Sequence, residues 1–103
     1  MINHNKLVRD KIPEIIRNHG DTPEFRTIED DAEYLTALTD KLVEEAREVQ
    51  ETPILDELAD ALEVVYAIGK AIGHTPEDIE KARAQKAEER GGFDDKVFLI
   101  STS

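Results

Sequence analysis

Two long stretches with helical apolar periodicity are neighbours in the middle of the chain. In the first, from Asp31 to Glu51, apolar residues recur at the 3.6-residue period of an amphipathic helix, at Leu35, Leu38, Leu42, Ala46 and Val49. The second, from Pro53 to about Ile72, is apolar almost all round, which is typical of a helix buried between neighbours. We interpret Thr52-Pro53 between them as closing the first helix and opening the second, with Thr52 as the N-cap of the second and Pro53 at its first position. The pattern predicts a helical hairpin.

Shorter elements flank the hairpin. A first helix should begin near Asp10 and end at Gly20, and a fourth should run from a Thr75 cap to about Arg90, with Asp78 completing a capping box. The segments EFRTI and KVFLI are β-prone and predict two short paired strands. The expected fold class is therefore all-α, a four-helix bundle with a minor β-ribbon, in one domain spanning residues 1–103.

Composition limits the possible partners. A chain of 103 residues buries only a modest core, so we expect an oligomer, either a homodimer or a homotetramer. Its 24 acidic and 13 basic residues give a net charge of −11, which argues against nucleic-acid polymers and anionic membranes as partners. Cysteine is absent, and the sequence has neither an apolar signal core nor a membrane span. We expect a soluble cytoplasmic protein.

Acidic residues recur on both halves of the expected hairpin. Glu44, Glu45 and Glu48 lie in the first half, and Glu57 and Asp60 lie in the second, with i,i+3 spacing in each half. Packing of the two helices would bring four or five carboxylates together, and these repel one another unless cations bind. Hard oxygen ligands suit Mg²⁺ or Mn²⁺. The sequence therefore predicts a metal site.

The helical repeat of about 100° per residue separates the members of this acidic set. Glu45 falls on the rim of the apolar stripe, and Glu57 and Asp60 point where apolar neighbours point. A carboxylate facing a core is costly unless it is paired or bound to metal. For Glu44 and Glu48, a solvated helix face is an equal alternative.

The acidic pattern resembles a known family signature. Glu44-Glu45-x-x-Glu48 followed by Glu57-x-x-Asp60 is similar to the EExxE…ExxD signature of MazG-type all-α nucleoside triphosphate pyrophosphohydrolases, a group that includes phosphoribosyl-ATP pyrophosphohydrolase. The segments NKLVRDKIPEII and KAEERGGFDDKVFL resemble one small-domain subgroup, so the resemblance covers nearly the whole chain. The short interval between Glu48 and Glu57 departs from the family pattern.

The resemblance implies Mg²⁺-dependent hydrolysis of a nucleoside triphosphate between its α and β phosphates, with Mn²⁺ as a possible substitute. By that resemblance Glu45, Glu48, Glu57 and Asp60 would be metal ligands. Glu44 would bind a second metal or activate water, so that Glu44, Glu45 and Glu48 form the catalytic set. Two alternatives stay open: phosphoribosyl-ATP as the substrate, and a non-catalytic acidic helical module that binds a partner protein.

Basic residues are the candidates for phosphate binding, which needs such donors. Lys86 and Arg90 come first, although both also suit the C-terminal end of a helix dipole. Arg9 and Lys11, in a basic group that includes Lys6, come second, because they could instead form structural ion pairs.

Overall fold

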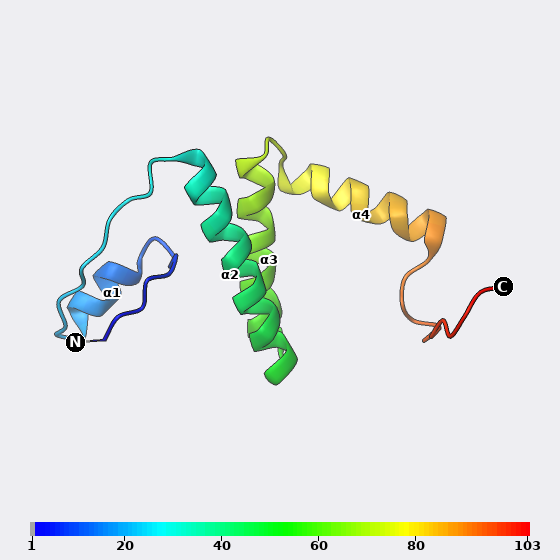
Figure 1. The fold of residues 1–103 in the computed structure, drawn as a ribbon, viewed down its shortest axis with the longest axis horizontal. Coiled ribbons are helices and arrows are strands. Elements are labelled where there is room, and N and C mark those ends of the chain that lie inside the picture. Colours follow the sequence, from blue (N-terminus) through cyan, green and yellow to red (C-terminus); the bar gives the residue numbers. More distant parts are fainter. Residues whose placement is uncertain (1) are drawn as a thin grey trace.

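The structure, a computed structural model, describes residues 2–103, and these residues form four α-helices and no strand (Figure 1). The helices are α1 (Ile12–Asn18), α2 (Asp31–Glu51), α3 (Leu55–Ala71) and α4 (Pro76–Arg90). The expected all-α class is confirmed. No helix in this part of the chain is long and apolar enough to cross a membrane.

Helices α2 and α3 pack against each other as a hairpin. Helix α2 begins where the Asp30 side chain accepts a 2.8 Å hydrogen bond from the Glu33 backbone N–H. It ends at Thr52, whose N–H donates to the Glu48 carbonyl over 2.9 Å. Thr52 therefore closes α2, and the prediction that it caps the next helix is wrong. Ile54, in an extended conformation, precedes α3 instead.

Helix α4 begins with the predicted capping box. Thr75 Oγ1 accepts from the Asp78 N–H over 3.1 Å, and the Asp78 carboxylate accepts from the Thr75 N–H over 3.0 Å. Near its start α4 crosses α3 closely at Gly69. A Cβ atom added to Gly69 would lie only 2.6 Å from Ile79 Cδ1. Beyond that crossing α4 leaves the hairpin and contacts no other helix in residues 2–103 (Figure 1).

The four helices do not close into a bundle within one chain. Among the described residues, Leu38 is the one buried large apolar side chain. The radius of gyration is 17.7 Å, whereas a compact domain of this length would have about 13 Å. Leu58 and Leu62 of α3 are about half exposed, so burial of this helix on all sides is wrong for the single chain.

The predicted β-ribbon does not form. Residues 24–28 lie in the loop before α2 and residues 96–100 lie beyond α4, at opposite ends of the molecule (Figure 1). A β-prone segment needs a paired neighbour to satisfy its backbone groups as a strand. Local propensity was present in both segments, but their partners were not within reach.

Candidate metal centre

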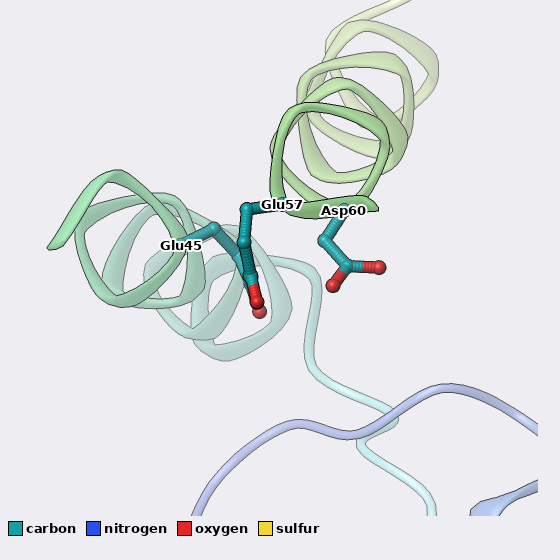
Figure 2. A group of neighbouring side chains, drawn as sticks. All are labelled: Glu45, Glu57 and Asp60. Atoms are coloured by element: carbon teal, nitrogen blue, oxygen red, sulfur yellow. The ribbon is translucent and has the colours of Figure 1, made fainter. Parts of the chain in front are cut away.

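Three carboxylates from the two long helices converge on one side of the hairpin. Glu45 extends from α2, and Glu57 and Asp60 extend from α3 (Figure 2). One oxygen atom from each of them lies within 4.8 Å of the other two. Glu45 is buried, with 9% of its surface exposed, and the other two are half-buried. We call these three residues the acidic cluster.

The short turn between the helices produces this convergence. Because the chain reverses immediately after Glu51, the last turns of α2 lie beside the first turns of α3. The i,i+3 spacing then brings Glu57 and Asp60 to the same flank of α3. Glu45 faces them from α2 (Figure 2).

The acidic cluster carries more negative charge than its surroundings neutralise. The pKa of Glu57 is raised above its ordinary value, first because partial burial disfavours the charged form and then because of the neighbouring charge of Asp60. Glu48 and Glu45 add to the repulsion. A cation bound at the acidic cluster would therefore stabilise the charged form of Glu57.

Two lysines bind the acidic residues on the α2 side. Lys41 Nζ lies 3.3 Å from Glu44 Oε2 and 3.5 Å from Glu45 Oε1. Lys6 Nζ donates to Glu44 Oε1 over 3.0 Å, and this hydrogen bond is the main cause that lowers the pKa of Glu44. Glu44 is therefore held by lysines and lies beside the acidic cluster.

Arg9 binds the acidic cluster on the α3 side. Its Nη2 donates to Asp60 Oδ1 over 2.7 Å. In Figure 2 the N-terminal part of the chain, in pale blue, passes below the three carboxylates. Residues far apart in the sequence thus place two basic side chains, Lys6 and Arg9, at the edge of one acidic group.

The other predicted site residues have different positions. Glu48 is exposed, and it acts on the acidic cluster through its charge on Glu57. Lys11 is the exposed N-cap of α1. Lys86 and Arg90 are exposed near the far end of α4, and the chain does not bring them to the acidic cluster (Figure 1). Their role in phosphate binding stays a prediction.

Sequence reasoning missed Lys41. Its signal was present, because it precedes Glu44 by three residues and Glu45 by four, the spacings at which side chains on a helix meet. In the sequence, Lys6 is one member of a basic group with Arg9 and Lys11. Its contact with Glu44 crosses 38 residues of sequence and has no local signal.

The donor set fits a hard divalent cation. All three ligands of the acidic cluster are carboxylates, without histidine or cysteine. Neighbouring oxygens around one Mg²⁺ ion lie about 3 Å apart. Side-chain movements that shorten the separations in the acidic cluster, now within 4.8 Å, by up to about 2 Å would therefore let all three residues hold one ion. Water and phosphate oxygens normally complete the coordination of Mg²⁺.

Comparisons with known proteins give a partial match. An uncharacterized protein of Mycolicibacterium smegmatis is 56% identical to this chain over 45 residues, which are 44% of this chain. The match covers 45% of that relative's own length, which is less than half. No family model matches the chain. No solved structure matches it either.

Proposed function

We propose that this chain is a Mg²⁺-dependent nucleoside triphosphate pyrophosphohydrolase of the MazG-like type. One observation carries the proposal: Glu45, Glu57 and Asp60, three residues of the EExxE…ExxD pattern, lie with oxygens within 4.8 Å of one another across the α2–α3 hairpin. Arg9 pairs with Asp60 of this group, and Lys6 pairs with Glu44, the neighbour of Glu45 in the sequence. Hydrolysis of a polyphosphate requires acidic metal ligands beside basic side chains that donate hydrogen bonds to phosphate.

Glu45, Glu57 and Asp60 would hold the metal ion in this proposal. Glu48, one turn beyond Glu45, would join as a fourth ligand by turning its long side chain toward Glu57. Mg²⁺ is the proposed ion, and Mn²⁺ suits the same oxygens. When bound, the ion neutralises the polyphosphate and polarises the phosphorus that is attacked.

Arg9 and Lys6 would bind phosphate oxygens of the substrate. Both already form charge-assisted hydrogen bonds to carboxylates at the site. When metal takes over the charge of Asp60, Arg9 becomes free to donate to phosphate, and Lys6 becomes free when it exchanges Glu44 for a phosphate oxygen. Glu44, released from Lys6, would then orient a water molecule for attack or bind a second ion.

The products would be a nucleoside monophosphate and pyrophosphate, because water attacks the α phosphorus and the bond to the bridging oxygen of the β phosphate breaks. The named contacts address phosphate and metal, so they do not select a base. We place this activity in the cytoplasm, with the protein acting as a homodimer or homotetramer.

The test is product identification. Purified protein is incubated with Mg²⁺ and a panel of canonical and modified nucleoside triphosphates, and the products are separated by chromatography. We expect monophosphate and pyrophosphate from the wild type and from Glu63→Gln, a matched charge change on an exposed residue of α3. Glu45→Gln should abolish the reaction. Turnover that survives in Glu45→Gln, or none in the wild type, would overturn the proposal.

A further inference from the structure

The segment after α4 leaves its apolar side chains uncovered. We call residues 91–103 the C-terminal arm. Five of its large apolar side chains are 74–97% exposed, namely Phe93, Val97, Phe98, Leu99 and Ile100. Soluble proteins rarely expose such a contiguous group unless it is an interaction surface.

A second apolar surface lies on the hairpin. Val43, Leu55, Leu58 and Leu62 are 47–79% exposed. On α3, Leu62 lies roughly 140–160° around the helix from Glu57 and Asp60, so this surface faces away from the acidic cluster. On α2 it includes Val43, Ala46 and Val49, which line a shallow depression together with Arg47 and Gln50. We call the six apolar residues the hairpin surface.

Among residues 2–103, the arm has no apolar partner close by. It continues from the end of α4 that points away from the hairpin (Figure 1). Within α4 the single large apolar side chain is Ile79, and it lies against Gly69 of α3. Helix α4 therefore offers no apolar surface on which the arm could fold back.

We infer that the C-terminal arm of one copy packs on the hairpin surface of a second copy, and that the exchange is reciprocal. Each chain carries both an uncovered arm and an uncovered surface, so two copies related by a twofold axis satisfy both and close the assembly. This inference does not depend on the proposed enzymatic activity.

The available area is sufficient for a stable pair. Phe93 and Phe98 are 97% and 87% exposed. A buried phenylalanine removes at least about 150 Å² from water, so the four in two exchanged arms supply roughly half of the about 1,200 Å² that a stable interface needs. The three aliphatic residues of each arm and the hairpin surface supply the rest. The extended shape of the single chain is explained in the same way.

The absence of cysteine permits a direct test of the contact. Leu58→Cys is introduced in a tagged chain and Phe98→Cys in an untagged chain, and the two are mixed and oxidised. We expect a disulfide that joins the tagged to the untagged chain. Glu63→Cys is the control and should give little of this product, because this exposed residue lies roughly 140° around α3 from Leu58. No mixed disulfide, or equal yield from the control, would overturn the inference.

The oligomeric state gives a second test. Light scattering should show a dimer for the wild type and a monomer for Phe98→Ser with Ile100→Ser, while circular dichroism shows that helix content is retained. A variant with both Leu58→Cys and Phe98→Cys reports on folding back, because a disulfide within one chain would contradict the exchange. A monomeric wild type would also contradict the exchange, and so would a dimer that survives the arm substitutions.

Discussion

Arg9 donates a 2.7 Å hydrogen bond to Asp60, which joins the segment before α1 to the acidic cluster on α3. Both side chains are more than two-fifths exposed, and ion pairs of this kind contribute at most about 1 kcal/mol to the free energy of unfolding. A strong effect of Arg9 on activity would therefore reflect substrate binding.

The first prediction concerns this arginine. Arg9→Ala should lower the free energy of unfolding by less than about 1 kcal/mol. It should raise the KM for a nucleoside triphosphate by about 10- to 100-fold, because a charge-assisted hydrogen bond to phosphate contributes roughly 1.5–3 kcal/mol. Steady-state kinetics beside a thermal melt measures both quantities.

Arg26 provides the matched control. It forms an exposed bidentate pair with Glu33, with distances of 2.9 and 3.0 Å, outside the acidic cluster. Arg26→Ala should change stability by a similar small amount and leave KM unchanged. Equal KM values for the wild type and Arg9→Ala would show that Arg9 does not bind phosphate.

A second prediction uses the raised pKa of Glu57, whose ordinary value is 4.5. Between 4.5 and its raised pKa, the folded state holds more protons than the unfolded state, so this group lowers the free energy of unfolding as pH rises. Without divalent ions, Glu57→Gln should therefore be more stable than the wild type. The difference in Tm should grow as pH rises from 4.5 through the raised pKa and should stay constant above it.

Glu44 should show the opposite dependence. Its pKa is lowered, mainly by the hydrogen bond from Lys6, so its contribution to stability is present above 4.5 and is lost as pH falls through the lowered pKa. Glu44→Gln should therefore be less stable than the wild type near neutral pH and equal to it in acid. Thermal melts of both variants from acid to neutral pH would refute this account if the two differences had the same sign.

A third prediction concerns the crossing of α3 and α4. Through helix propensity alone, Gly69→Ala should raise the free energy of unfolding by up to about 1 kcal/mol. The new methyl group would however lie 2.6 Å from Ile79 Cδ1, which must move. The gain should therefore be larger in an Ile79→Ala background. A double-mutant cycle measures the coupling, and additive effects would show that the two residues do not contact each other.

Local signals in the sequence predicted the helices well where they were unambiguous. The periodic stretch from Asp31 predicted the start of α2, and Thr75 with Asp78 predicted the capping box of α4. At Thr52 two signals competed. Its N–H closes α2 by bonding Glu48, so α3 begins after Ile54 without a side-chain cap.

Periodicity in the sequence does not predict contacts between residues that are far apart in the chain. The convergence of Glu45 with Glu57 and Asp60 followed from the hairpin and could be predicted. The contact of Arg9 with Asp60 joins residues 51 positions apart, and no local pattern indicates it. The sequence predicted a strand at residues 96–100, in the C-terminal arm, because its β-prone apolar side chains need a partner. Composition does not indicate where that partner lies.

Direct metal binding tests the central claim, that the acidic cluster holds a divalent cation. The free Mn²⁺ signal in electron paramagnetic resonance is followed while protein is added, for the wild type, Glu45→Gln and the exposed control Glu63→Gln. We predict that the wild type and Glu63→Gln remove Mn²⁺ from solution equally, that added Mg²⁺ releases it, and that Glu45→Gln binds at least tenfold more weakly. Equal binding by Glu45→Gln and the wild type, or no binding by the wild type, would contradict the account.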